Sequence, residues 1–444
     1  MKTDLLIIGA GPAGLAAAFA ASKSGLNIDI VDDNFQSGGQ IWRGGAPQQS
    51  DVRARDMWLA LSQAENVRFH FQSKLIQLER SEENLIATVE HNDQQRSSQI
   101  AARRLIIATG ARELLLPFPG WTLPGITGAG GLQALAKNGY PVKGKKVVVA
   151  GTGPLLLAVA ATLTERGAIV THILEQASLA SLSRFALGLL RTPTKLKQAF
   201  ALGWKLKATR YLANSFVIAA EGKEQVATIR VSNNGDIQEF NCDLLACAYG
   251  LLPNLEIAAA LGCAIENDDD MPRIKVDQWQ QTNLNQVYCA GETTGIGGVD
   301  LAIAEGSIAG YAASDQRDLA IDAIKQRAIW QGFAERLKQG FALRSELRHL
   351  CQKDTIVCRC EDVRYAQLQD HADWRSAKLH TRCGMGACQG RICGNANRFL
   401  FSWERDLGRL PLHSCNIGHL IDTHIEKADS ITSMNIASRN EQEI

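Results

Sequence analysis

Apolar runs, glycine turns and helical stretches alternate along the first two thirds of the chain. Residues 4–8 form an apolar run of the kind that is buried in a parallel sheet, and the helical stretch after the next turn reaches Ser24. The apolar run 27–31 then ends at two aspartates, which completes one βαβ pattern. The same order of strand, turn, helix and strand returns over 146–175. Two such units predict an α/β protein with two doubly wound dinucleotide-binding domains.

Later apolar runs predict that the second domain is inserted into the first. Residues 103–110 predict a strand that leaves the first domain, 242–254 a strand and turn that leave the second, and 286–300 a return to the first. We therefore expect a first domain over 1–118 and 276–320, a second domain over 119–275, a helical connection over 321–350, a small C-terminal domain over 351–425, and a polar tail over 426–444.

Composition narrows the class of protein. The net charge of +1 gives no reason to expect a nucleic-acid partner, and no apolar run is long enough for a transmembrane segment. The 11 cysteines are an odd number, and five of them crowd into 358–393. A secreted disulfide framework would spread its cysteines, so we expect a reducing cytoplasm and a metal site. One basic run predicts a solvated helix face, with a docking surface for an acidic partner as the alternative: Arg184, Arg191, Lys195, Lys197, Lys205, Lys207 and Arg210.

The first glycine turn has the spacing of a dinucleotide site. Gly9 allows the tight turn, Gly11 lets a pyrophosphate approach the backbone, and Gly14 lets the helix pack on the strand. The turn follows a predicted strand and opens a predicted helix, which is the context that supports the motif. Asp32 and Asp33 are both placed to bind ribose hydroxyls, and the spacing slightly favours Asp32.

The second glycine turn departs from this spacing. Gly151 and Gly153 are present, but Leu156 stands where the third glycine normally allows contact between helix and strand. Glu175 lies where an acid would bind ribose. We expect either a pocket that has lost its nucleotide or one that holds NAD or another nucleotide, with NADH chemistry disfavoured.

The clustered cysteines predict an iron–sulfur centre. Cys358 and Cys360 form one loop, and a second loop carries Cys383, Cys388 and Cys393. A cluster takes four thiolates, so the second pair is either the first two or the last two of these three. Structural zinc fits the Cys-x-Cys spacing less well.

The glycine motifs resemble those of the two-dinucleotide-fold flavoprotein oxidoreductases. The resemblance rests on the first βαβ unit together with 38–41, 108–110 and 288–292, and it extends to about residue 320. Glu292 replaces the aspartate of that family and keeps its charge, whereas the sequence has no Cys-x-x-Cys, so dithiol chemistry is not expected. The resemblance implies FAD at Gly9, Gly11, Pro12, Ala13, Gly14, Asp32, Asp33, Gly39, Gln40, Arg43, Ala108, Thr109, Gly110, Gly291 and Glu292.

The cysteine segment resembles the small [2Fe-2S] domain of the bacterioferritin-associated-ferredoxin type. In that family the second pair of ligands lies at the end of a Thr-x-x-Gly-x-Gly run. Residues 381–386 of this chain match that run. The resemblance implies a [2Fe-2S] cluster held by Cys358, Cys360, Cys388 and Cys393, with Cys383 as a non-ligand.

The order of all these motifs resembles the FAD-containing subunit of heteromeric flavin dehydrogenases that act on amines, imino acids and opines. The closest motifs are those at 38–43, 151–157, 290–298 and 381–393. The resemblance implies a hetero-oligomer in which a partner flavoprotein, similar to glycine and sarcosine oxidases, oxidises a C–N bond while this chain relays the electrons. The alternatives are a stand-alone NADH-dependent reductase, which Leu156 disfavours, and a structural nucleotide-binding subunit.

Overall fold

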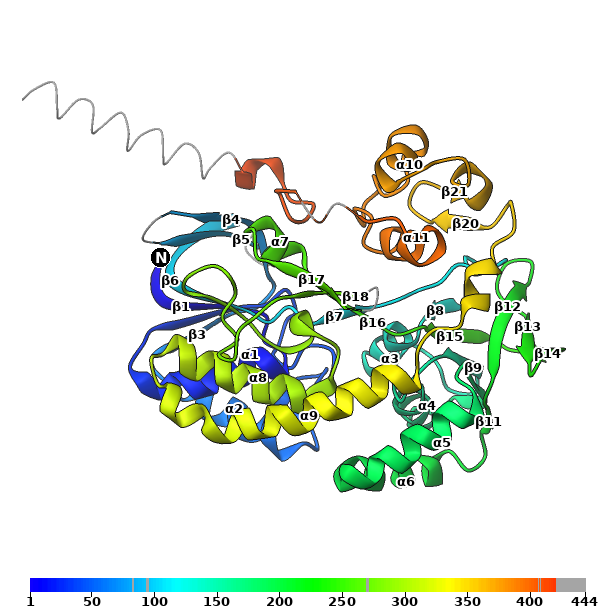
Figure 1. Ribbon diagram of the computed structural model, residues 1–444, viewed down its shortest axis with the longest axis horizontal. Helices are drawn as coiled ribbons and strands as arrows, with labels where there is room; N and C mark the ends of the chain where they lie inside the picture. Colours follow the sequence, from blue (N-terminus) through cyan, green and yellow to red (C-terminus); the bar gives the residue numbers. More distant parts are fainter. Residues whose placement is uncertain (82–83, 93–95, 269–270, 406, 408, 421–444) are drawn as a thin grey trace, which may run out of the picture. The chain divides into compact units, whose positions relative to one another are not determined.

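The computed structural model describes residues 1–420, except 82–83, 93–95, 269–270, 406 and 408. The chain forms two compact units (Figure 1). Unit 1 contains Met1–Gly110, Pro253–Trp330 and the part from Leu407 onward, and unit 2 contains Ala111–Leu252 and Gln331–Asp406. The finer domain boundaries expected from the sequence stay predictions, and the expected polar tail lies outside the described residues.

The sheet of unit 1 combines parallel and antiparallel halves. Its order is β3-β2-β1-β6-β5-β4, with β19 also paired to β6. β6 is long enough to serve both halves: its first part pairs antiparallel with β5, and its last part pairs parallel with β1 and β19. The strands are β1 (Lys2–Ile8), β2 (Ile28–Val31), β3 (Val67–His70), β4 (Ser73–Arg80), β5 (Leu85–His91), β6 (Arg96–Ile107) and β19 (Val287–Cys289). β19 comes after residues 111–252 of unit 2 in the sequence, yet it pairs with β6 in the sheet of unit 1, as the insertion pattern predicts.

Two alanine-rich helices pack closely in unit 1. A Cβ added to Gly306 of α8 would lie 2.1 Å from the Ala13 carbonyl oxygen of α1, and one added to Gly310 would lie 2.2 Å from the Ala17 carbonyl oxygen. The backbones of the two helices therefore touch, and no larger residue fits at either glycine. These two helices are α1 (Pro12–Ala21) and α8 (Gly298–Ala313), and the other elements of unit 1 are α2 (Val52–Ser62), α7 (Glu256–Ala260), β17 (Ile265–Asp268), β18 (Met271–Ile274) and the first half of α9 (Ile321–Gly340).

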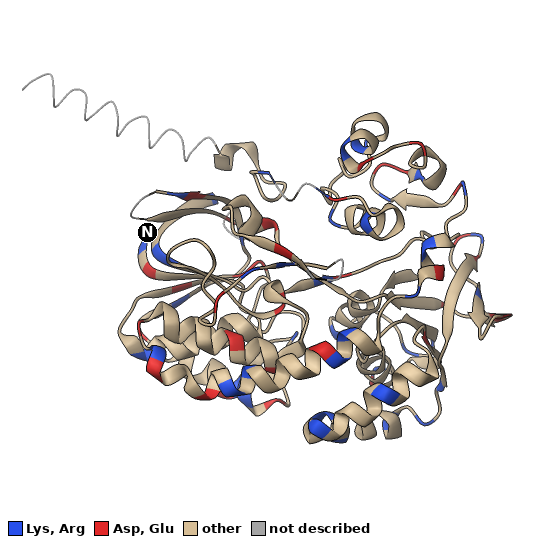
Figure 2. Cartoon of the chain, in the orientation of Figure 1, with Lys and Arg blue, Asp and Glu red and all other residues tan. Residues whose placement is uncertain are grey.

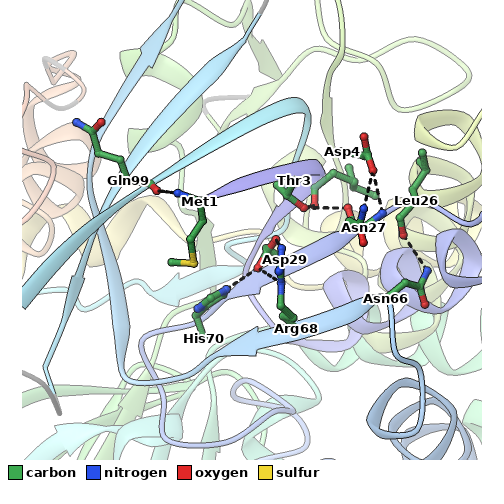
Figure 3. A network of polar contacts seen from close by, with 11 residues as sticks. Met1, Thr3, Asp4, Leu26, Asn27, Asp29, Asn66, Arg68, His70 and Gln99 are labelled. Carbon is green, nitrogen blue, oxygen red and sulfur yellow. Dashed lines mark hydrogen bonds and ion pairs between the residues drawn. The ribbon is translucent and has the colours of Figure 1, made fainter. Parts of the chain in front are cut away.

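The strand next to the edge of the parallel half, β2, carries a buried acid. Asp29 of β2 is fully buried and accepts hydrogen bonds from Arg68 (2.7 and 3.0 Å) and from the His70 ring nitrogen (2.6 Å), both on β3 (Figure 3). Burial alone would raise the pKa of Asp29, but the hydrogen bonds from His70 and Arg68 lower it to about 2. This network ties β2 to the strand beside it through side chains as well as through the ladder.

Unit 2 contains a parallel sheet of five strands. Its order is β11-β10-β9-β15-β8, and every neighbouring pair is parallel. A separate antiparallel sheet, β12-β13-β14, packs in the same core as strands of the parallel sheet. The elements are β7 (Ala111–Glu113), β8 (Ile126–Gly128), α3 (Ala129–Lys137), β9 (Lys146–Gly151), α4 (Leu155–Glu165), β10 (Ile169–Glu175), α5 (Leu179–Gly188), α6 (Pro193–Lys205), β11 (Arg210–Leu212), β12 (Ser215–Glu221), β13 (Thr228–Asn233), β14 (Asp236–Asn241), β15 (Leu244–Ala248) and β16 (Leu251–Pro253). The predicted α/β class is confirmed, with a doubly wound type of sheet in each unit.

The cysteine segment folds as a small body within unit 2. Its elements are β20 (Ile356–Cys358), β21 (Val363–Arg364), α10 (Trp374–Thr381) and α11 (Cys393–Phe401). A core of its own includes Val357, Leu368 and Trp374. The indole Nε1 of Trp121 donates a 2.5 Å hydrogen bond to the Ile356 carbonyl oxygen, which joins this body to the rest of unit 2.

Candidate functional site

The first glycine turn joins β1 to α1, and its backbone requires glycine. Gly9 has φ +106°, and a Cβ there would lie 2.4 Å from the Ala108 carbonyl oxygen. A Cβ on Gly14 would lie 1.8 Å from the Gly9 carbonyl oxygen. Gly11 differs, because its φ of −75° suits any residue and the space around its Cβ position is open. No side chain caps the N-terminus of α1, so its first N–H groups are available to an anion.

Asp32 lies directly beside this turn. It is buried at the end of β2, and its carboxylate accepts hydrogen bonds from the Ala10 N–H (2.6 Å) and the Asn34 N–H (2.8 Å). Asp33 is exposed and accepts only a 3.2 Å bond from the Asn34 side chain among the bonds of the described residues. Of the two acids that the sequence offers, Asp32 is therefore the one that the fold holds against the glycine turn.

The glycine pair at 38–39 lies against the same turn. Gly39 has φ +58°, and a Cβ there would lie 3.1 Å from the Gly11 Cα. The Gly38 N–H donates to the Ala10 carbonyl oxygen at 2.8 Å. Gln40 is exposed and accepts a 2.8 Å hydrogen bond from Arg43. The two glycine segments thus bring their backbones together where a pyrophosphate would lie.

A third glycine turn, at the end of β19, completes the arrangement. Gly291 has φ +76°, and a Cβ there would lie 2.8 Å from the Ala13 Cβ, so this turn abuts the start of α1. The Glu305 carboxylate accepts hydrogen bonds from the Gly291 N–H (2.9 Å) and the Thr294 hydroxyl (2.8 Å). Sequence reasoning missed Glu305, which lies 13 residues beyond the motif on α8 and has no spacing signal.

Burial raises the pKa of both acids near this turn. Glu305 is buried, and its pKa rises to about 7 although it accepts two hydrogen bonds. The pKa of Glu292 also rises to about 7 for the same reason, and a hydrogen bond from the Gly298 backbone opposes the rise. These two acids therefore titrate near neutral pH, where a carboxyl can either donate or accept a hydrogen bond.

The Ala-Thr-Gly segment after β6 lies between the first and third turns. The Ala108 N–H bonds to the Ile8 carbonyl oxygen, and the Ala290 N–H bonds to the Ile107 carbonyl oxygen. Thr109 is held by Asn254, whose side-chain amide donates to the Thr109 carbonyl oxygen at 2.7 Å. The predicted flavin motifs are thus brought to the carboxyl ends of three neighbouring parallel strands, β1, β6 and β19, which is where ligands bind in doubly wound sheets.

The residues present fit a dinucleotide such as FAD. The N-terminus of α1 is uncapped, and glycine backbones line the approach to it. The Ser37 hydroxyl, next to the glycine pair, is buried and has no hydrogen-bond partner among the described residues. A polar ligand at the edge of this site would give the Ser37 hydroxyl a partner.

The second glycine turn is built differently. Gly151 needs its glycine, since a Cβ there would lie 1.8 Å from the Ala248 carbonyl oxygen. Leu156 is buried in the core of this sheet, where the first turn has Gly14. Glu175 is buried, and one of its oxygens accepts a 2.7 Å hydrogen bond from the Gly153 N–H. The first turn has a comparable contact between Asp32 and the Ala10 N–H, so the clearest difference between the two turns is Leu156 in the place of Gly14.

Five thiols gather in the cysteine segment. The Sγ atoms of Cys358, Cys383 and Cys393 lie within 4.8 Å of one another, and all three residues are buried. Interactions with the neighbouring thiols of Cys393 and Cys360 lower the pKa of Cys388 to about 5. Two of the four predicted ligands, Cys358 and Cys393, thus lie within ligand distance of each other, and Cys360 and Cys388 lie in the loops beside them. Soft thiol donors of this kind fit an iron–sulfur cluster.

Cys383 is the thiol that the sequence interpretation set aside, and it lies inside the group. It is fully buried, and the Asn397 side-chain amide donates a 3.4 Å hydrogen bond to its sulfur. Its proximity to Cys358 and Cys393 does not by itself make it a ligand, because a cluster takes only four of the five thiols. The choice of Cys358, Cys360, Cys388 and Cys393 stays a prediction.

Comparison with known proteins places the chain in a large group of oxidoreductases. Residues 3–306 match the profile of the family "Pyridine nucleotide-disulphide oxidoreductase". The chain is 29% identical to the hydrogen cyanide synthase protein HcnB of Pseudomonas protegens, over 88% of this chain and 90% of that protein. It is also 29% identical to one of the subunits of opine oxidase from Rhizobium meliloti, over 93% of this chain and 85% of that protein.

The fold is similar to that of a solved dehydrogenase. The crystal structure of L-proline dehydrogenase from P. horikoshii superposes with a TM-score of 0.67 and 20% sequence identity. The match covers 95% of this chain and 79% of that chain. At this identity the likeness concerns the fold, and it extends beyond the family profile into the cysteine segment.

Proposed function

The chain belongs to the pyridine nucleotide-disulphide oxidoreductase family, and from this membership we propose that it is the FAD- and iron–sulfur-containing subunit of a heteromeric enzyme. The enzyme oxidises a C–N bond of an amino acid, an imino acid or an opine. The relatives from hydrogen cyanide synthase and opine oxidase are both named as subunits, and both match nearly the whole chain. In this proposal a partner flavoprotein similar to glycine and sarcosine oxidases carries the substrate site.

The observation that carries the proposal is the pairing of two sites on one chain. Three glycine turns converge at the start of α1 in unit 1, and the thiols of Cys358, Cys383 and Cys393 lie within 4.8 Å of one another in unit 2. An FAD takes up and releases electrons one or two at a time, and a [2Fe-2S] cluster passes single electrons. A chain with both groups is suited to relaying electrons that another subunit collects.

The protein's own groups would hold the flavin nucleotide in place. The uncapped N–H groups of α1 favour the pyrophosphate charge, and Asp32 is positioned for the ribose hydroxyls. The Glu305 carboxylate accepts a hydrogen bond from the Gly291 N–H, and this bond orients the Gly291 turn against α1. Cys358, Cys360, Cys388 and Cys393 would hold the cluster.

The alternative of a stand-alone NADH-dependent reductase fits the second turn less well. Leu156 fills the position of the third glycine, and Glu175 takes the Gly153 N–H. Leu156 removes the close contact between helix and strand that the third glycine of such a turn allows. An occupied second nucleotide site therefore has no support beyond Gly151 and Gly153.

Anaerobic titration of the purified chain with proline, hydroxyproline, opines and glycine tests the proposal. We expect no bleaching of FAD by the chain alone and stoichiometric bleaching by one of these substrates when the partner flavoprotein is added. The flavin released on denaturation should be FAD. Full bleaching without a partner would place the substrate site on this chain and refute the relay role.

A further inference from the structure

The two helices between β10 and β11 expose large apolar side chains to an unusual degree. We call α5, the short 3₁₀ turn 189–191 and α6 the basic helical pair. Neither α5 nor α6 contains a fully buried residue. Trp204 is 76% exposed, Phe200 is 71% exposed, and three leucines are 67–69% exposed: Leu179, Leu187 and Leu190. Exposed apolar residues scattered singly need no explanation, but five within 26 residues are a concentration that does.

These residues share one side of each helix. Phe200 and Trp204 are four residues apart on α6, and Lys197 belongs to the same face. Leu179 and Leu187 are eight residues apart on α5, and Leu190 follows at the next turn. The opposite sides face the protein: Phe185 of α5 stacks edge-on against Phe341 and contacts Phe333 of α9, and Leu206 after α6 is buried.

The charge of this segment has one sign. Residues 176–220 contain seven Lys and Arg residues and no Asp or Glu. Figure 2 shows blue residues and no red ones on α5 and α6. On the neighbouring elements Glu165 is paired with Lys205 (2.6 Å), and Glu335 accepts a hydrogen bond from Gln339. Lys207 lies over the Trp204 ring at 5.3 Å, so cations border the apolar patch directly.

Taken together, these observations lead us to propose that the basic helical pair binds the surface of an anionic lipid bilayer. Helices with Lys and Arg beside exposed Trp, Phe and Leu lie in the membrane interface, with the aromatic side chains at the level of the headgroups. No helix among the described residues is long and apolar enough to cross a membrane. The pair would therefore lie on the bilayer rather than span it.

Other occupants fit the surface less well. A second copy of this chain would bring seven cations against seven, which repel each other. Protein interfaces are depleted in lysine at their centres, whereas Lys197 lies among the exposed aromatic residues of α6. A bilayer of anionic lipids supplies both an apolar layer and dispersed negative charge, and it needs no matching shape.

Flotation of the full-length protein with vesicles tests the proposal. We expect binding to phosphatidylcholine vesicles that contain phosphatidylglycerol, weak binding to pure phosphatidylcholine, and loss of binding in high salt. Each exposed cation removed should weaken binding about fivefold. The triple variant Arg184→Gln, Arg191→Gln and Lys197→Gln should therefore bind about a hundredfold more weakly.

Apolar contact is tested separately from charge. Phe200→Gln with Trp204→Gln should weaken binding about tenfold or more. Ile237→Gln on β14 is the matched control, because Ile237 is 65% exposed in the same unit but lies outside the pair. Lys223→Gln is the charge control. Thermal unfolding of each variant shows that the fold is kept.

Depth is measured with brominated lipids, which quench nearby tryptophans. Anionic vesicles with brominated chains should quench the protein, and Trp204→Phe should remove most of that quenching. Equal binding to neutral and anionic vesicles, or unchanged binding by the triple variant, would overturn the proposal. If the triple variant lost binding to the partner flavoprotein but kept binding to the vesicles, the proposal would be overturned too. That result would assign the surface to a protein contact.

Discussion

Gly11 and Gly14 illustrate two reasons for the same residue type. Gly14 is required by the fold, since its Cβ would collide with the Gly9 carbonyl oxygen at 1.8 Å. Gly11 has an ordinary φ and open space, with the nearest atom, the Gly39 Cα, 4.0 Å away. The protein itself would accept a side chain at Gly11, so the reason for glycine there lies in what approaches the backbone.

Gly11→Val should therefore keep the fold and lose the flavin. We expect less than about a tenth of the parent flavin content, measured by absorbance after purification, with a thermal midpoint close to that of the apoprotein. Gly203→Val is the control, because Gly203 also has open space but lies on α6. Full flavin content in the Gly11 variant would contradict the assignment of FAD to this turn.

The thiol group poses a question that the spacing of the cysteines left open. The family resemblance implies four of the five thiols as ligands. The fifth, Cys383, lies within 4.8 Å of two of them, Cys358 and Cys393. The Asn397 amide that donates to Cys383 could not be anticipated, because it comes from the next helix and has no motif of its own.

We expect Cys360→Ser to abolish the electron-spin resonance signal of the reduced cluster and Cys383→Ser to retain it. The reason is that four thiolates suffice and Cys360 belongs to the Cys-x-Cys loop. Cys415→Ser, outside the group, serves as the control. Loss of the signal in Cys383→Ser together with its retention in Cys393→Ser would reverse the choice of ligands.

Among the elements, parallel strands were the most predictable. Their apolar runs at 4–8 and 27–31 appear as β1 and β2, shifted by a residue or two at their ends. The antiparallel sheets were not predicted from the sequence. Polar and apolar residues are mixed in short runs on β4 and β5, and most residues of β14, which pairs with β13, face solvent. Such strands depend on partners distant from the glycine motifs, so those motifs do not reveal them.

The buried acid on β2 makes one element sensitive to acid. Because the pKa of Asp29 falls from 3.8 to about 2 on folding, its contribution is present above pH 4 and is lost as the pH drops towards 2. The shift corresponds to about 1–2 kcal/mol, since Arg68 is half exposed and partly screened.

Asp29→Asn should lower the thermal midpoint at pH 7, and the difference from the parent should shrink as the pH approaches 3. Differential scanning calorimetry over this range measures it. Asp56→Asn on the exposed face of α2 is the control and should change little. A midpoint difference that does not vary with pH would show that the Arg68 and His70 contacts do not stabilise the charged form.

At the scale of the whole molecule, the two glycine turns predict unequal use of dinucleotides. The first turn has Gly14 where its helix touches the strand, whereas the second has the buried Leu156 at that position. Sequence spacing revealed Leu156 but not the hydrogen bond from the Gly153 N–H to Glu175, because that contact exists only once β9 and β10 lie side by side.

Rapid mixing with NADH should accordingly reduce the FAD of the isolated chain slowly or not at all. Stopped-flow absorbance at the flavin band measures the rate, and dithionite provides the control that the flavin can be reduced. Fast reduction that saturates with NADH would revive the interpretation as a stand-alone reductase.

The late arrival of β19 in the first sheet has a consequence for biosynthesis. β1 and β6 are made early, but their shared sheet, and the α1 surface that α8 covers, remain incomplete until residues 287–313 have left the ribosome. The parallel sheet of unit 2 is encoded entirely within 126–248, so the middle of the chain has all its strands before the beginning does. Because domains fold as units during synthesis, the N-terminal strands keep apolar surface exposed until the segment that completes their sheet has been made.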